Sequence, residues 1–242
     1  MLKPNHSLNF VGGSLLKPIY RAVSSHIKNK ESAFTLAEVL IAMTIIGVVA
    51  AMTIPTLHYS RMKQEYSAKL KNFYSRMSNA VLDMEVDHGS FKEIPIPVVN
   101  STRSEFDWYM RYFDPYMGHK MVNDAKMTVY FADGSSLFPY YSGFYSEFAY
   151  DVNGDKGPNK LGYDRFYFLF AQNDTARKNC FGNSDTYFGP YCPAGTSVTQ
   201  MPRETILARC RDGWGNYPVG AWCVMLLQND QWEFKADYPL KF

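Results

Sequence analysis

Cysteine is scarce in this 242-residue chain, and none precedes Cys180. The four cysteines contain no Cys-x-x-Cys unit, the spacing from which zinc fingers and zinc ribbons are commonly built. A structural zinc site is therefore not expected.

Catalytic signatures are missing as well. None of the five histidines lies in a His-Glu-x-x-His motif, and no Gly-x-Ser-x-Gly nucleophile motif occurs. His88 beside Asp87 is typical of a solvated helix end rather than of a catalytic dyad. The sequence therefore predicts a chain that is not an enzyme.

No basic stripe, internal repeat or low-complexity tract is present either. Lys and Arg total 25 against 23 Asp and Glu, for a formal net charge of +2. Proteins that bind nucleic acid gather basic residues to neutralise phosphates, so no nucleic-acid partner is indicated.

One long apolar run is present, from Phe34 to Ile54. All its residues are apolar or glycine except Thr35, Glu38, Thr44 and Thr53. As a helix the run would rise about 31 Å, enough to cross the hydrocarbon of a bilayer. We therefore predict a transmembrane helix over residues 34–57. A carboxylate in such a helix is costly and marks a functional site.

The segment before the run is a basic leader. Residues 1–33 hold five Lys and Arg against the single acid Glu31, which predicts a cytoplasmic N-terminus and an exported remainder. The small residue Ala33 precedes the apolar run rather than following it. Cleavage after Ala33 would leave the helix attached and create an amine on Phe34, one turn from Glu38.

The start of the run resembles a known motif. The residues that carry the resemblance are Ala33-Phe34-Thr35-Leu36-Ala37-Glu38-Val39-Leu40-Ile41, with Gly47 and Pro55 beyond them. They are similar to the N-terminal cleavage and methylation motif of type IV prepilins and of type II secretion pseudopilins. The resemblance covers about residues 30–57. The chain departs from the family in having Ala33 where glycine is usual, and in its long leader.

The resemblance implies a filament subunit processed at the inner membrane. A prepilin peptidase would cut between Ala33 and Phe34 and methylate the amine of Phe34. Glu38 would neutralise the terminal amine of a neighbouring subunit. Further implied partners are other pilin or pseudopilin subunits, an inner-membrane assembly platform and membrane lipid. The expected location is the bacterial inner membrane, single-pass with an extracytoplasmic head, and then a filament at the cell surface.

After Leu57 the pattern predicts an amphipathic continuation of the helix over residues 58–88. Apolar residues recur there every three or four positions, namely at Tyr66, Leu70, Phe73, Met77, Val81 and Met84. Pro55 predicts a kink and Gly89 a helix stop. The alternative is two helices broken at Pro55.

Residues 89–242 predict a head that contains an antiparallel sheet. Asp133-Gly134 between two apolar segments indicates a hairpin. The expected strands cover residues 127–132, 136–141, 144–150, 165–170 and 221–227, and short helices cover 103–117 and 203–208. A long helix followed by such a sheet is an α+β fold, which the pilin resemblance also implies.

A loop between two expected strands resembles a calcium site. Asp151, Asn153 and Asp155 alternate like the first ligands of a calcium loop. Gly162 occupies the twelfth position, where an EF-hand has a bidentate Glu, so Asp164 would have to close the site. The alternative is a metal-free turn held by side-chain to backbone hydrogen bonds. Calcium is thus the one cofactor under consideration.

The cysteines are all expected on the exported side of the membrane, where disulfides persist. We favour the local pairs Cys180–Cys192 and Cys210–Cys223, because each bond would close a loop that packing alone would not stabilise.

Aromatic residues, at 16% of the chain, suggest an alternative function. Tyr140, Tyr145 and Tyr191 fall in segments expected at the surface, and aromatic side chains are favoured at interfaces. They would serve subunit contacts or ligand adhesion, and the alternative is that they pack in the core of the head. With ligand adhesion, the chain would be a membrane-anchored, adhesin-like ligand-binding protein that does not polymerise. Glu38 discriminates between the two functions, because a simple anchor gains nothing from a buried acid.

Overall fold

The computed structural model describes residues 34–98, 101–141, 145–182, 185–192 and 201–241. The chain forms two compact units, one ending at Val48 and the other covering Val49–Phe242. The expected leader with Ala33, and the first residue of the strand expected from Phe144, lie outside the described residues.

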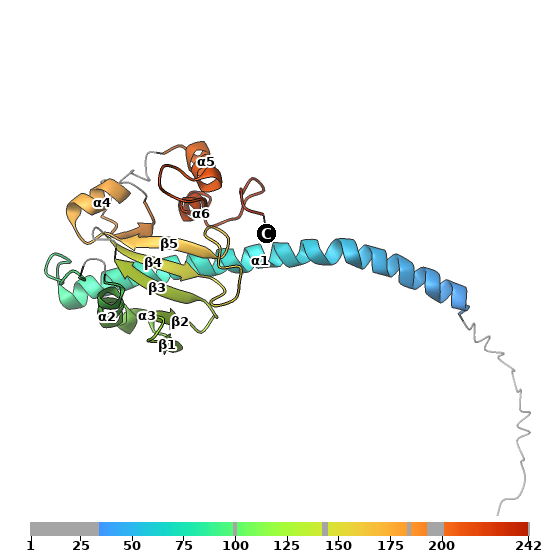
Figure 1. Cartoon of the computed structure of the whole chain (residues 1–242), viewed down its shortest axis with the longest axis horizontal. Coiled ribbons are helices and arrows are strands. Elements are labelled where there is room, and N and C mark those ends of the chain that lie inside the picture. The colour runs from blue at the N-terminus through green and yellow to red at the C-terminus, as the bar shows by residue number, and fades with distance from the viewer. Residues whose placement is uncertain (1–33, 99–100, 142–144, 183–184, 193–200, 242) are drawn as a thin grey trace, which may run out of the picture. The chain divides into compact units, whose positions relative to one another are not determined.

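The elements follow one another as a long helix, a sheet and a set of short helices. The helices are α1 (Leu36–His88), α2 (Thr102–Tyr112), α3 (Asp114–Met117), α4 (Asp174–Phe181), α5 (Arg203–Asp212) and α6 (Cys223–Asn229). The strands are β1 (Met121–Asn123), β2 (Thr128–Tyr130), β3 (Ser136–Tyr141), β4 (Ser146–Asp151), β5 (Arg165–Phe170) and β6 (Phe188–Pro190). Each strand pairs antiparallel with the next, so the sheet is a six-stranded meander (Figure 1). The predicted α+β, pilin-like fold is confirmed.

Helix α1 is a single helix that continues through Pro55, so the alternative of two helices is wrong. It is long and apolar enough to cross a membrane, with a mean hydropathy of 2.2 over its most apolar 18 residues. Because Pro55 has no amide N–H to donate to the preceding turn, a kink is predicted there. This kink stays a prediction. Gly89 ends the helix as expected, with φ +79° and an amide that donates to the Glu85 carbonyl at 2.9 Å.

The apolar stripe of α1 packs against one face of the sheet (Figure 1). The six residues singled out by their helical spacing are all buried, namely Tyr66, Leu70, Phe73, Met77, Val81 and Met84. Phe73 stacks on Tyr150 with ring centroids 4.0 Å apart and meets Phe168 edge-on at 5.1 Å. Burying each such side chain contributes about 1.5–3 kcal/mol. The amphipathic part of α1 is therefore an integral part of the core.

The hairpin expected at Asp133-Gly134 is confirmed as the turn between β2 and β3. Gly134 has φ +83°, which a residue with a side chain rarely adopts. The Asp133 carboxylate accepts hydrogen bonds from the Ser135 amide and hydroxyl at 3.0 and 2.5 Å. The strands expected over 144–150 and 165–170 are present as β4 and β5.

The strand expected over residues 221–227 is wrong, because this segment contributes to helix α6. Every residue from Ala221 to Leu227 is buried. A segment buried on all sides shows neither the alternation of a half-buried strand nor the stripe of a surface helix. Gly220 precedes the helix with φ +90°, and a Cβ there would lie 2.2 Å from the Leu161 carbonyl oxygen. Only glycine allows this close approach.

The helix expected over residues 103–117 is divided into α2 and α3 at Phe113. Pro115 has no amide to donate to the carbonyl of Arg111, which favours a break in the helix at this point. The helix expected over 203–208 is present as α5. The sequence analysis did not anticipate β1, β6 or α4. The two strands have three residues each, too few for a clear alternation.

Two disulfides join segments near the sheet. Cys180 of α4 is bonded to Cys192, which follows β6, and Cys210 of α5 is bonded to Cys223 of α6. Their Cα atoms lie 5.4 and 4.7 Å apart, within the usual range for disulfides. Both bonds have the local pairing favoured by the sequence.

Candidate functional site

The first turn of α1 is built around Thr35 and Glu38. The Glu38 carboxylate accepts hydrogen bonds from the amide and from the hydroxyl of Thr35, both at 2.9 Å. In return, the Glu38 amide donates to the Thr35 hydroxyl oxygen at 3.2 Å. This reciprocal arrangement is a capping box, which satisfies amides that the first turn of a helix leaves without partners.

The capping box determines where Glu38 points. It folds the carboxylate back toward the N-terminal end of the helix, where the dipole of the helix favours a negative charge. Phe34 directly precedes this cap, and its side chain is 84% exposed. Cleavage before Phe34 would break none of the three hydrogen bonds, because all join Thr35 to Glu38. Glu38 is thus held one turn from the amine that cleavage would create.

Sequence reasoning missed the role of Thr35, although the spacing Thr-x-x-Glu was there to be read. The sequence pointed to the amine of Phe34 as the partner of Glu38, whereas the structure also gives its carboxylate two donors from Thr35. Both hydrogen bonds use one carboxylate oxygen, Oε2. The acid therefore has capacity for a further, charged partner.

The rest of the predicted membrane span is apolar, and the hydroxyls of Thr44 and Thr53 within it are hydrogen-bonded. Glu38 is its one charged residue. The hydroxyls of Thr44 and Thr53 donate to carbonyls one turn back, at 2.8 and 2.9 Å. The large apolar side chains of the span are well exposed, and they include Leu36, Leu40, Ile41, Met43, Ile45, Ile46, Met52 and Ile54. So continuous an apolar surface requires lipid or the apolar surface of other helices.

In the loop that resembles a calcium site, the carboxylates of Asp151 and Asp164 accept hydrogen bonds from other groups of the protein. Asp151 is buried, and its carboxylate accepts from Arg165 Nε at 3.0 Å and from the Asn153 amide at 3.1 Å. Asp164 is also buried and accepts from the backbone amides at 159–160, at 2.8 and 2.5 Å. These donors take positions that a cation would otherwise fill.

Asp155, the third expected carboxylate, is bound to a neighbouring part of the sheet. It accepts from the Tyr130 hydroxyl at 3.0 Å and lies 3.3 Å from Lys126 Nζ. These two contacts lower the pKa of Asp155, the Tyr130 hydrogen bond most. Among the residues described, no group of three or more His, Cys, Asp and Glu side chains is placed to hold a metal ion. Calcium binding and the metal-free turn are the two alternatives for this loop that an experiment has to separate.

A calcium titration of the mature full-length chain tests this loop. We expect millimolar calcium to leave the thermal unfolding midpoint unchanged, because a cation would have to displace Arg165 and three backbone amides from the carboxylates. The measurement is circular dichroism on heating, with magnesium as the reference. A rise of several degrees that disappears in Asp151→Asn would instead establish a calcium site.

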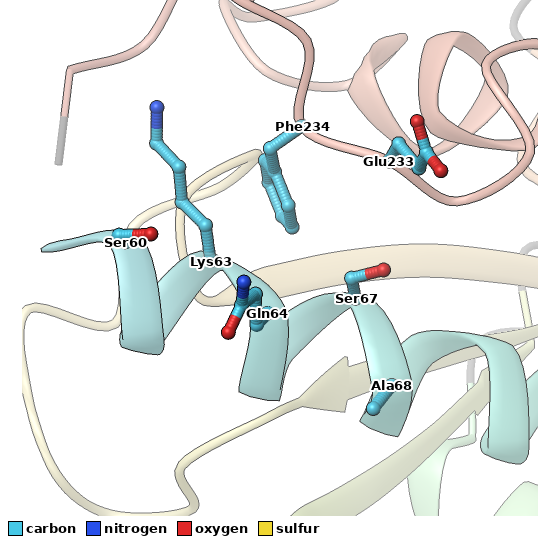
Figure 2. Close-up of a pocket in the computed structure, with 7 residues that line it drawn as sticks. All are labelled: Ser60, Lys63, Gln64, Ser67, Ala68, Glu233 and Phe234. Carbon is cyan, nitrogen blue, oxygen red and sulfur yellow. The ribbon is translucent and has the colours of Figure 1, made fainter.

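A cleft of about 460 Å³ lies between α1 and the segment after α6 (Figure 2). Figure 2 shows Ser67 of α1 pointing toward this segment, and its hydroxyl donates to the Trp232 carbonyl at 2.5 Å. The residues that line the cleft are Ser60, Lys63, Gln64, Ser67, Ala68, Glu233 and Phe234. This set includes neither histidine nor cysteine, so it offers no nucleophile paired with an imidazole base.

Comparison with known families places a motif at the start of the chain. Residues 28–54 match the prokaryotic N-terminal methylation motif. This match includes Ala33, Phe34, Thr35 and Glu38, and it confirms the prepilin-type cleavage and methylation motif. Such a motif suggests a structural subunit rather than an enzyme. No curated protein and no solved structure matches the chain.

The remainder of the chain matches a second family model. Residues 56–242, which include the sheet and all the short helices, match a family of unknown function (DUF6613). The motif, the long apolar helix and the antiparallel sheet together describe a type IV pilin- or pseudopilin-like protein. The chain belongs to the DUF6613 family and carries an N-terminal methylation motif ahead of the family's region.

Proposed function

We propose that the chain is a filament subunit of a type IV pilus or a type II secretion pseudopilus. Prepilin peptidase removes residues 1–33 and methylates the amine of Phe34. The mature chain waits in the bacterial inner membrane, with its N-terminus cytoplasmic and the sheet outside. An inner-membrane assembly platform then transfers it into the filament, where its N-terminal helix packs among those of other subunits.

The observation that carries this proposal is the single carboxylate of Glu38 on an otherwise apolar helix end. The Thr35 cap makes the carboxylate tolerable in the membrane, because two donors are already aimed at it. In a filament the same carboxylate meets the terminal amine of an adjacent subunit. An unpaired charge in an apolar bundle is costly, so this pairing sets the register between subunits.

A second candidate is the membrane-anchored ligand-binding protein. It is favoured by a hollow on the sheet whose lining includes Tyr140 and Tyr167. Ligand binding and filament assembly are compatible, so the two functions differ in one respect: an anchor does not polymerise. Cross-linking between N-terminal helices of neighbouring copies distinguishes them.

N-terminal mass spectrometry of the mature protein tests the processing step. We expect a mature chain that begins at Phe34 and carries a methyl group on its amine. Ala33→Gly restores the residue usual in the family and should be cut at the same bond. Ala33→Leu places a bulky side chain at the scissile bond and should accumulate as precursor. A mature chain that begins elsewhere contradicts the proposed function, because Glu38 would no longer lie one turn from a free amine.

A further inference from the structure

The face of the sheet that points away from α1 carries a hollow of about 260 Å³. The residues that line it are Phe138, Tyr140, Glu147, Ala149 and Tyr167, from strands β3, β4 and β5. Their neighbours along the strands, such as Leu137, Phe148 and Phe168, are buried on the α1 side. Successive residues of a strand point to opposite faces. The hollow therefore belongs to the outer face.

Strand register builds the hollow. Ala149 pairs with Phe138 on one side and with Tyr167 on the other. Two strand spacings separate Phe138 from Tyr167, about 10 Å, with only a methyl group between them. Ala149 is thus the floor and the two rings are the walls. In the next row, Tyr140 pairs with Glu147 and closes one end.

Further tyrosines lie near the carboxylate of Glu147. The Tyr167 ring meets Tyr191 edge-on with centroids 5.9 Å apart, and Tyr191 meets Tyr217 at 6.2 Å. Burial, and after it the negative charge of Glu147, raises the pKa of Tyr191 well above its usual range. Burial and Glu147 likewise raise the pKa of Tyr145. The region around the hollow is thus rich in aromatic rings and includes the carboxylate of Glu147.

We propose that this hollow binds a compact organic cation, the alkylammonium group of a small molecule. Aromatic rings present a negative face to a cation, and Phe138, Tyr140 and Tyr167 supply three such rings. Among the described residues that line the hollow, Glu147 carries the only charge and adds direct attraction. The volume is below the roughly 300–1,000 Å³ of sites for drug-sized ligands, so the ligand is small.

A neutral sugar would also stack on aromatic rings, but it would gain little from the charge of Glu147. Charge complementarity therefore favours the ammonium ion, and the sugar becomes an outcome of the test. The site does not depend on the helix end that serves assembly, because its five residues all lie on the sheet. Cation binding and filament assembly can accordingly fail or succeed separately.

Isothermal titration of the mature full-length chain with choline tests the proposal. The protein is kept in a polyoxyethylene detergent, because choline or sugar head groups would compete for the site. The neutral isostere 3,3-dimethylbutan-1-ol reports apolar binding alone, and methyl glucoside reports sugar binding. We expect choline to bind at least about fivefold more tightly than either neutral compound.

Variants of the lining residues assign the binding to this hollow. Glu147→Gln keeps the shape but removes the charge, and we expect about fivefold weaker choline binding. Tyr167→Leu removes one aromatic wall and should weaken binding to a similar extent. Glu233→Gln makes the same chemical change in the cleft of Figure 2 and should leave binding unchanged. Circular dichroism shows whether each variant is folded.

Three results would overturn the proposal. The first is equal binding of choline and its neutral isostere, and the second is binding of the sugar without binding of choline. The third is choline binding that folded Glu147→Gln retains in full.

Discussion

We expect a Glu38→Ala chain to be cleaved and inserted into the membrane normally but not to enter filaments. Its span is more apolar than that of the wild type, so insertion is not impaired. In the filament, however, the amine of the neighbouring Phe34 is left without its counter-ion. Removing one partner of a buried ion pair costs about 3–5 kcal/mol, which corresponds to a loss of roughly two to four orders of magnitude in the association constant of each contact. The measurement is the amount of subunit in sheared filaments relative to the membrane pool.

Two matched variants separate the charge of Glu38 from its part in the helix cap. Glu38→Gln keeps an oxygen that accepts from Thr35 but removes the charge, and it should also block assembly. Thr35→Val removes the hydroxyl that joins the cap, at a cost of about 1 kcal/mol to the helix. It should reduce assembly without abolishing it, and Thr35→Ser should restore it. Normal incorporation of Glu38→Gln would show that the charge has no role.

The second large effect concerns Glu105, a carboxyl group of α2 that is completely buried in the core. No hydrogen bond of normal geometry reaches either of its oxygens from the described residues. Burial raises the pKa of Glu105 to about 8; the nearby Ser146 hydroxyl lowers it and the negative charge of Glu147 raises it, each by less than burial does. The folded chain therefore keeps a proton on Glu105 at a pH where the unfolded chain has lost it.

The sign of the pH effect follows from this difference in proton binding. Between about pH 4.5 and pH 8 the folded state binds more protons than the unfolded state, so stability falls as the pH rises. Above pH 8 the group is ionised in both states and the loss is complete. At about 1.4 kcal/mol for each pH unit, Glu105 alone removes roughly 4–5 kcal/mol of the free energy of unfolding across this window.

Replacing Glu105 with glutamine isolates its contribution. Glu105→Gln should resemble the wild type near pH 4.5 and exceed it by roughly 4–5 kcal/mol near pH 9. The measurement is urea unfolding of the mature chain followed by tryptophan fluorescence. Asp151, whose pKa burial raises to about 6, contributes a slope to both proteins, so the difference between the curves is informative.

An exposed carboxylate of the same helix is the control for Glu105. The side chain of Asp107 is 56% exposed and pairs with Arg103 at 2.9 Å. Asp107→Asn should change the stability by less than about 1 kcal/mol, because an exposed ion pair contributes little. Parallel curves for the wild type and Glu105→Gln would show that Glu105 is not protonated in the folded chain.

Features with a local physical cause could be read from the sequence. The helical spacing of Tyr66, Leu70 and Phe73 predicted the buried side of α1, because an amphipathic helix repeats its environment every 3.6 residues. The Asp133-Gly134 hairpin followed from the conformational freedom of glycine and the hydrogen bonding of aspartate. The Thr35 and Glu38 cap is equally local, and sequence reasoning overlooked it rather than lacked the means to find it.

Features made by contacts distant in the chain were decided by the tertiary structure. The segment from Ala221 to Leu227 is buried on all sides, so its pattern carried no information about helix or strand. Asp155, in the loop after β4, is held by Tyr130 of β2 and by Lys126, and the hollow over Ala149 exists because the register places that alanine between two rings. Register depends on cross-strand packing, which one sequence does not display. The sequence by itself thus determined the methylation motif with its charged Glu38 at the start of the apolar helix, and the amphipathic continuation of that helix. The tertiary structure alone decided which side chains meet on the outer face of the sheet.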